Sequence, residues 1–258
     1  MTWICRWPAG LLILPLMLCA TSARSGETEG ERIMKLMDAA LTCVDDQMME
    51  YELVSQKPGE SQRAMRMVVY TKGTEWRRIE FLAPGDLKGT RVLVLSPSQM
   101  YVYLPAYRKI RRVASHTKDQ GFMGTAYSND EMSVVTYSPV FRGKLLRGTD
   151  THWTIEGTRR EGQEFSYPRM EFDIIKETQF PSEFRYYNDK GELVKTETRT
   201  DYTFQHGVWN PRVSRMVDHT RNGAWTSLIR RAFKPNLGLK DSFFTVRSLQ
   251  RRGSGRPR

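Results

Sequence analysis

Hydrophobic positions at two different spacings divide the chain into one helical stretch and a long series of short strands. Between Glu31 and Val44 the apolar residues recur every three or four positions, which predicts an amphipathic helix with a single apolar stripe. The acidic residues Glu29 and Glu31 lie at its beginning, where the helix dipole favours negative charge. From Met49 onwards the period changes to two, which is typical of β-strands.

The alternating stretches are short and are separated by turn residues. Strands are expected over residues 49–54, 65–69, 76–82, 91–95, 100–104, 109–114, 143–149, 152–159, 165–176, 183–188 and 192–203. The dipeptide Asn222-Gly223 predicts a tight hairpin between two further strands, because both residues tolerate positive φ. Near the C-terminus, Asp241 is expected to cap a short helix that carries Phe243 and Phe244.

Short strands joined by tight turns predict a mainly β (α+β) fold built on one antiparallel sheet. One amphipathic helix is too small to cover the apolar face of so many strands. Either the sheet curls strongly on itself, or part of its concave face stays open as a hydrophobic cavity. The alternation of residues leaves both possibilities open.

The first residues have the pattern of an export signal. Arg6 provides a positive charge before the apolar run Leu11–Ala20, which is much shorter than the about 20 apolar residues of a membrane-spanning helix. We therefore expect a signal peptide over residues 1–24 that is removed on export. Lipidation at Cys19 is the less favoured alternative, because the bulky Leu18 precedes it.

The rest of the chain shows no internal repeat and no long low-complexity linker. We expect one domain over residues 25–250 and a basic, disordered tail over residues 251–258. The full chain has a net charge of +11, to which this arginine-rich tail contributes. A basic excess favours acidic partners such as nucleic acid or an anionic membrane surface, and export makes nucleic acid the poorer choice. The alternative is a solvated face with a solubilising tail.

Motifs for catalysis are absent from the sequence. The four histidines have no His, Cys or carboxylate partner at metal-ligand spacing, and there is no nucleophile elbow, phosphate-binding loop or dinucleotide fingerprint. We expect no enzymatic activity, no metal site and no cofactor. An envelope hydrolase stays an alternative that would require a cluster of polar side chains in a cleft.

The chain contains 13 methionines, most of them in its N-terminal half. Their flexible thioether side chains fill irregular cores and also adapt to ligands of variable shape. Core filling and a pocket for lipid tails are both compatible with this pattern.

Several stretches carry a resemblance to a known family. Tyr103–Ala106, Lys109–Val113 and Phe122–Gly124 together resemble the signature of the LolA-like outer-membrane lipoprotein-sorting proteins of the bacterial periplasm. Pro84–Thr90 is similar to a turn of that family, and Phe244–Leu249 is similar to its terminal motif.

This resemblance implies a curved antiparallel half-barrel whose concave face is covered by the N-terminal helix, short helices and a loop. It also implies a cavity that shields the acyl chains of lipids or lipoproteins as they cross the envelope towards the outer membrane. It also implies association with an inner-membrane lipid transporter. We expect a monomer without nucleic-acid partners, and transient membrane contact is left open. The alternative function is a non-enzymatic accessory or partner-binding module of an envelope lipid transporter.

In this interpretation the segment Tyr103–Met132 is a strand, a basic turn and a lid-like loop at the mouth of the cavity. The side chains expected to contact lipid tails are Trp76, Tyr101, Tyr103, Phe122, Met123, Tyr127 and Met132. The side chains expected near anionic head groups or an acidic partner are Lys109, Arg111 and Arg112. Alternatively, the aromatic residues anchor the loop on the core and the arginines pair across strands with Asp or Glu.

Overall fold

The computed structural model of the protein describes residues 27–114 and 121–251. The expected signal peptide and residues 252–258 of the expected basic tail lie outside the described residues.

The described strands form a single 13-stranded sheet. They are β1 (Asp46–Gln56), β2 (Arg63–Lys72), β3 (Trp76–Ala83), β4 (Arg91–Ser96), β5 (Gln99–Leu104), β6 (Lys109–Arg112), β7 (Phe141–Gly148), β8 (His152–Arg159), β9 (Arg169–Ile175), β10 (Pro181–Tyr187), β11 (Leu193–Gln205), β12 (Val208–Asp218) and β13 (Ala224–Pro235). Every pair of neighbours in the sheet is antiparallel. The predicted fold class is therefore confirmed.

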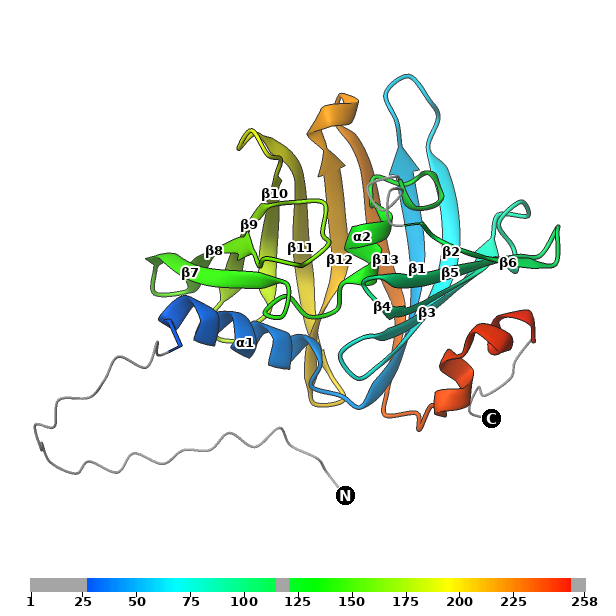
Figure 1. The fold of residues 1–258 in the computed structure, drawn as a ribbon, viewed down its shortest axis with the longest axis horizontal. Helices are drawn as coiled ribbons and strands as arrows, with labels where there is room; N and C mark the ends of the chain where they lie inside the picture. The colour runs from blue at the N-terminus through cyan, green and yellow to red at the C-terminus, as the bar shows by residue number, and fades with distance from the viewer. Residues whose placement is uncertain (1–26, 115–120, 252–258) are drawn as a thin grey trace, which may run out of the picture.

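The sheet is built from two meanders joined at its centre. Strand β1 pairs with β13, with Gln47 opposite Pro235 and Gln56 opposite Trp225, while β2–β6 and β12–β7 continue outwards in order. The sheet does not close, because β6 and β7 are its two edges. Figure 1 shows that the outer strands swing across in front of the upright central strands, which gives the sheet a concave inner side.

The helices of the described part of the chain are few and short. They are α1 (Glu29–Leu41), α2 (Asn129–Ser133) and the 3-10 helices η2 (Phe122–Gly124), η3 (His219–Arg221), η4 (Asp241–Phe244) and η5 (Val246–Gln250). Helix α1 crosses in front of the lower part of the sheet, and α2 lies before its central strands (Figure 1). Among the described residues, no helix combines the length and the apolar character that crossing a membrane would require.

Helix α1 is positioned by a cap and by a close backbone approach. The hydroxyl of Thr28 accepts a hydrogen bond from the Glu31 amide, and the Glu31 carboxylate accepts one from the Thr28 amide, which forms a capping box. A Cβ atom on Gly30 would lie 2.6 Å from the backbone nitrogen of Leu145 on β7. The helix therefore rests directly on the backbone of an edge strand.

The main hydrophobic core lies on the concave side. It joins Ile33, Met34 and Met37 of α1, all fully buried, to the inward-facing side chains of the sheet. Aromatic residues dominate its β7–β10 half, where Tyr137 stacks on Phe184 at a centroid distance of 5.2 Å.

A second hydrophobic cluster covers the outer side of β2–β5. Here Phe243, Phe244 and Leu249 of the C-terminal segment, defined as residues 237–251, pack on the sheet. Arg78, which is fully buried, donates to the carbonyl of Phe243 and to the hydroxyl of Ser248 at 2.9 and 2.8 Å. The expected C-terminal helix thus exists as two 3-10 turns, and it covers the convex face rather than the concave one.

Several boundaries differ by a few residues from the expected ones, and two of these differences have a clear local cause. Helix α1 starts earlier, at Glu29, because Thr28 caps it. Strand β9 starts at Arg169 rather than 165, because Pro168 lacks the amide that a central strand needs; Phe165 and Tyr167 instead pack on the concave core. The predicted hairpin at Asn222-Gly223 is confirmed, with positive φ at both residues.

Candidate functional site

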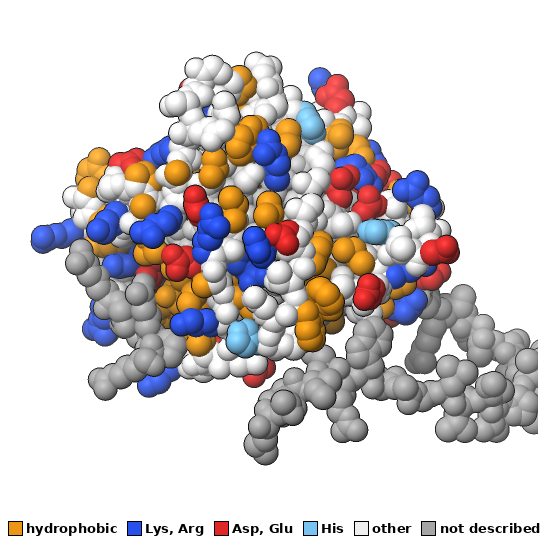
Figure 2. All heavy atoms as spheres, turned by 180° about the vertical axis from the view of Figure 1, so that it is seen from behind, with side chains coloured by type: hydrophobic (Ala, Val, Ile, Leu, Met, Phe, Trp, Pro, Cys, Tyr) orange, Lys and Arg blue, Asp and Glu red, His pale blue; other side chains and the backbone are white. Residues whose placement is uncertain are grey.

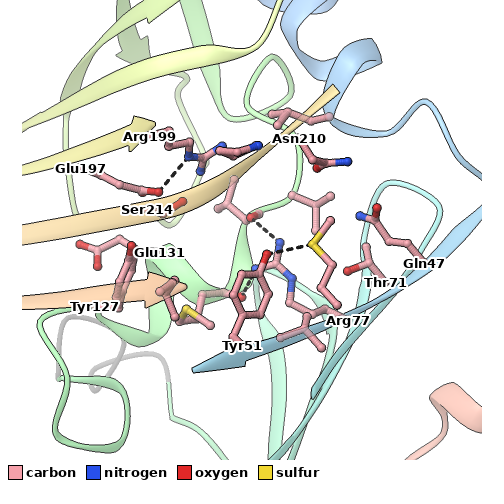
Figure 3. A pocket seen from close by; sticks show the side chains of 18 of the residues that line it. Gln47, Tyr51, Thr71, Arg77, Tyr127, Glu131, Glu197, Arg199, Asn210 and Ser214 are labelled. Atoms are coloured by element: carbon pink, nitrogen blue, oxygen red, sulfur yellow. Dashed lines mark hydrogen bonds and ion pairs between the residues drawn. The ribbon is translucent and has the colours of Figure 1, made fainter. Parts of the chain in front are cut away.

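A cavity of about 170 Å³ lies on the concave side, between the central strands and the segment that contains α2. Figure 3 shows its walls, which come from β1–β3 and β11–β13. The apolar lining residues are Leu41, Met49, Met67, Val69, Met132, Val134, Val135, Phe180, Pro211 and Leu228. The polar ones are Gln47, Tyr51, Thr71, Arg77, Tyr127, Glu131, Tyr137, Glu197, Arg199, Asn210 and Ser214. The cavity is therefore amphipathic, whereas the sequence led us to expect a purely hydrophobic lining.

The roof of the cavity is residues 121–135, which are held down by buried polar contacts. The ammonium of Lys195 on β11 donates to the Ala126 carbonyl and to the Glu131 carboxylate, both at 2.9 Å. The amide of Ala126 donates to the hydroxyl of Thr226 on β13 at 2.9 Å. Because the Lys195–Glu131 pair is almost completely buried, its rupture would leave a charge without compensation.

Arg77 reaches the roof from β3. Its guanidinium donates to the backbone carbonyls of Met132 and Val134, at 2.6 and 3.3 Å. Among the described residues it has no carboxylate partner, and its Nε atom is buried without a hydrogen-bond acceptor. Burial lowers the pKa of Arg77, although the group stays cationic, and nearby Arg199 adds to this effect. The roof contact thus leaves one cation of the cavity only partly satisfied.

Arg199 is the second guanidinium of the cavity, and it is paired. Its Nε lies 2.9 Å from the Glu197 carboxylate, and its guanidinium carbon lies 4.4 Å from the centre of the Phe184 ring. Burial acts to lower the pKa of Arg199, but Glu197 outweighs it and the pKa is raised. Counting Lys195 with Glu131 and Arg199 with Glu197, Arg77 is the surplus positive charge.

Three tyrosines complete the polar part of the lining. Burial raises the pKa of Tyr51, Tyr127 and Tyr137, so all three remain neutral hydroxyl donors near neutral pH. The hydroxyl of Tyr51 donates a hydrogen bond to the sulfur of Met49. The hydroxyl of Tyr127 is buried and has no partner among the described residues. An unused donor therefore lines the same cavity as the surplus cation.

The structure brings only two of the expected lipid-contacting residues to this cavity, Tyr127 and Met132. Phe122 is buried in the core beside Phe81, with ring centres 5.9 Å apart, and Met123 is half-buried with φ of 50°. These two anchor the roof, which corresponds to the alternative weighed for the aromatic residues.

Trp76, Tyr101 and Tyr103 lie on the other face of the sheet. All three pack against the C-terminal segment, so the expectation that they face the cavity is corrected. The reason is strand alternation: on β3 the inward positions are Arg77 and Ile79, which places Trp76 outside.

Lys109, Arg111 and Arg112 lie on the edge strand β6, where they are exposed and distant in the sheet from the cavity walls. Arg112 donates to the carbonyl of Ser98 at 3.1 Å. Their expected contact with head groups or an acidic partner stays a prediction. Over the face seen in Figure 2, basic and acidic side chains are interspersed, with hydrophobic patches between them.

The sequence interpretation missed the charged residues Arg77, Glu197 and Arg199 of the cavity lining, and Lys195, which holds the roof. The sequence did contain a signal for these residues. Each of them lies two positions along its strand from another residue that faces inward. Charged side chains on the buried face of a strand are costly unless they are paired, so such positions point to a functional or structural role.

The site offers charge and hydrogen bonds but no cluster of metal ligands. Within residues 27–114 and 121–251, no group of three or more His, Cys, Asp or Glu side chains is placed to hold a metal ion. The arrangement can bind a ligand that has an apolar part and a hydrogen-bond acceptor.

Comparisons with known proteins agree with this architecture. A family model described as that of an uncharacterized protein matches residues 73–251, which is more than half of the chain. No protein of curated function matches the sequence.

Three crystal structures share the fold. A DUF1329 family protein from Desulfovibrio piger is 24% identical with a TM-score of 0.79, over 85% of this chain and 97% of that one. A domain assigned to outer membrane lipoprotein sorting from Vibrio parahaemolyticus is 22% identical with a TM-score of 0.75, over 86% and 99% of the two chains. A LolA superfamily protein from Nitrosomonas europaea is 19% identical with a TM-score of 0.72, over 85% and 98%.

Proposed function

We propose that this chain is a LolA-like protein, a non-enzymatic periplasmic carrier that shields acyl chains of lipids or lipoproteins in its concave cavity. The observation that carries the proposal is the cavity itself, which has a continuous apolar side formed by Met49, Met67, Val69 and Leu228. Burial of hydrocarbon there contributes about 25 cal/mol per Å², so affinity needs no catalytic group.

The size of the cavity determines how a ligand would enter. Sites for drug-sized ligands are about 300–1,000 Å³, and this cavity measures about 170 Å³. A short chain fits it as it stands, whereas a long acyl chain requires the roof to move away from the central strands. The roof rests on a few polar contacts, and on this proposal these contacts set the cost of admitting a long chain.

Chain-length dependence provides the direct test. Affinity for the fatty acids from octanoate to tetradecanoate, measured by displacement of a fluorescent fatty-acid probe, should rise roughly fourfold for each added CH₂ group until the cavity is full. Affinity that does not depend on chain length, or no uptake of any probe, would contradict a carrier role. The second result would favour the alternative, an accessory module that binds an envelope lipid transporter.

A matched pair of variants shows whether binding takes place in this cavity. Ser214→Trp places a large ring in the cavity, because Ser214 lines it from β12. Thr200→Trp adds the same ring to an exposed position on the neighbouring strand β11. We expect Ser214→Trp to lower probe uptake at least tenfold and Thr200→Trp to leave it unchanged. Equal uptake by the two variants would place the binding site elsewhere.

A further inference from the structure

The concave cavity contains two polar groups that the protein itself does not satisfy. The hydroxyl of Tyr127 and the Nε of Arg77 are both buried, and neither has a hydrogen-bond partner among the described residues. Buried donors without acceptors cost about 1–3 kcal/mol each, and native proteins contain few of them. Because both residues line one cavity, a ligand in this cavity could supply the missing acceptors.

The charge of the cavity specifies what kind of acceptor fits. Lys195 is neutralised by Glu131 and Arg199 by Glu197, while Arg77 is held only by backbone carbonyls. A buried cation without a counter-ion is unfavourable, and a second guanidinium in the same cavity adds to the repulsion. An anion next to Arg77 would remove both penalties, whereas a neutral acceptor would remove neither.

We propose that this cavity recognises an amphiphile with a carboxylate or phosphate head, bound head-inwards by Arg77 and Tyr127. The anionic oxygens accept from the Arg77 guanidinium and from the Tyr127 hydroxyl, and Arg199 supplies longer-range attraction. The hydrocarbon part lies along the apolar wall, on Met67, Val69 and Leu228. This inference rests on the proposed carrier function and names the class of ligand for the same cavity.

The buried donors of the cavity, and not the exposed cations of the edge strand β6, are expected to recognise the head group. The exposed cations of β6 would meet an anionic head group in water, where an ion pair contributes about 0–1 kcal/mol. A hydrogen bond from a buried donor to a charged acceptor is worth about 1.5–3 kcal/mol. Selectivity for the head group is therefore expected to depend on the cavity and not on Lys109, Arg111 or Arg112.

The test compares dodecanoate with dodecanol, which differ only in the head. Wild-type protein should bind the acid at least tenfold more tightly at pH 8, where the carboxyl group is ionised. Tyr127→Phe should remove most of this preference, because it deletes only the hydroxyl. Since that hydroxyl has no hydrogen-bond partner within residues 27–114 and 121–251, the variant should fold with unchanged or slightly higher stability.

Two further variants support the interpretation. Arg77→Met should abolish the preference for the acid, with a circular dichroism spectrum to show that the sheet is intact. Tyr202→Phe is the matched control, because its hydroxyl donates to the Pro181 carbonyl and does not line the cavity. This control should keep the full preference for the acid.

The outcomes are distinct. Equal affinity of acid and alcohol, or a preference that survives both Tyr127→Phe and Arg77→Met, overturns the anion site while leaving the carrier function in place. Displacement of bound dodecanoate by an equal concentration of inorganic phosphate also overturns the inference, because the cavity would then recognise a free anion. If neither the acid nor the alcohol binds, the proposed carrier function fails together with it.

Discussion

The contact between α1 and β7 predicts that Gly30→Ala destabilises the protein, although alanine is the better helix former. In an exposed helical position this substitution would stabilise by about 1 kcal/mol. Here the new methyl group would lie 2.6 Å from the Leu145 nitrogen and 2.7 Å from the Gly143 carbonyl oxygen, where ordinary contact begins at 3.4 Å. Both contacts are with backbone, which cannot rotate away.

The size of this loss of stability follows from the side chains that α1 buries. The helix has to withdraw by roughly 1 Å, and a gap of that size forfeits about a quarter to a half of the dispersion attraction across the interface. The side chains at stake are Ile33, Met34 and Met37, each fully buried and each worth about 1.5–3 kcal/mol. After subtraction of the gain in helix propensity, the net loss is about 1–3 kcal/mol, which is the usual range for overpacking.

Urea unfolding followed by circular dichroism measures this loss, and two variants serve as controls. Gly85→Ala adds a methyl group in open space and should change the free energy of unfolding by less than about 1 kcal/mol. Ala39→Gly lies on the exposed side of α1 and should cost about 1 kcal/mol through propensity alone. If Gly30→Ala proves as stable as wild type or more so, the close packing of the helix on β7 is refuted.

Three other perturbations have defined outcomes. Lys195→Met leaves the buried Glu131 without its cation and should lower the free energy of unfolding by about 3–5 kcal/mol, with faster hydrogen exchange in the roof. Arg78→Met removes a buried donor that binds the C-terminal segment and should make this segment susceptible to proteolysis before the sheet unfolds. Burial opposes ionisation of Asp173, but Arg185 outweighs it and lowers the pKa of Asp173 below its ordinary value of 3.8. The stability that this pair provides is present above that ordinary pKa and is lost as the pH falls through the lowered one, so Asp173→Asn should flatten the acid limb of a plot of melting temperature against pH.

Each of these three substitutions has a control substitution of the same residue type at an exposed position. Lys144→Met, Arg112→Met and Asp150→Asn change the same residue types at exposed positions, where substitutions usually alter the free energy of unfolding by less than about 0.5 kcal/mol. Effects of similar size in a variant and its counterpart would show that the buried contacts do not carry the stated energies.

The fold was predictable from the sequence because its signal is local. Strand alternation, tight turns and one apolar helical stripe were sufficient to predict an antiparallel sheet with a concave face. The fold that the resemblance to the LolA-like family implies is confirmed by the comparisons. Even the cap of α1 could have been read from Thr28 and Glu31. These features depend on neighbours in the sequence and not on distant contacts.

The lining of the cavity was less predictable, because it depends on which face each strand presents. Alternation separates two faces but does not say which one is concave, so the outward Tyr101 and Tyr103 were assigned to the inside. The pairing of Lys195 with Glu131 joins residues far apart in the sequence. The surplus charge on Arg77 is visible only after every other ion pair of the cavity is known.

The pairing of β1 with β13 limits when the sheet can finish folding. The first and the last strands of the chain are neighbours at the centre of the sheet, with Asp46–Gln56 lying along Ala224–Pro235. Ladders between distant segments pay a large loop-closure entropy and form late in folding. A nascent chain that lacks its last strands would present an unprotected strand to any aggregation partner, so productive assembly has to wait for nearly the whole polypeptide.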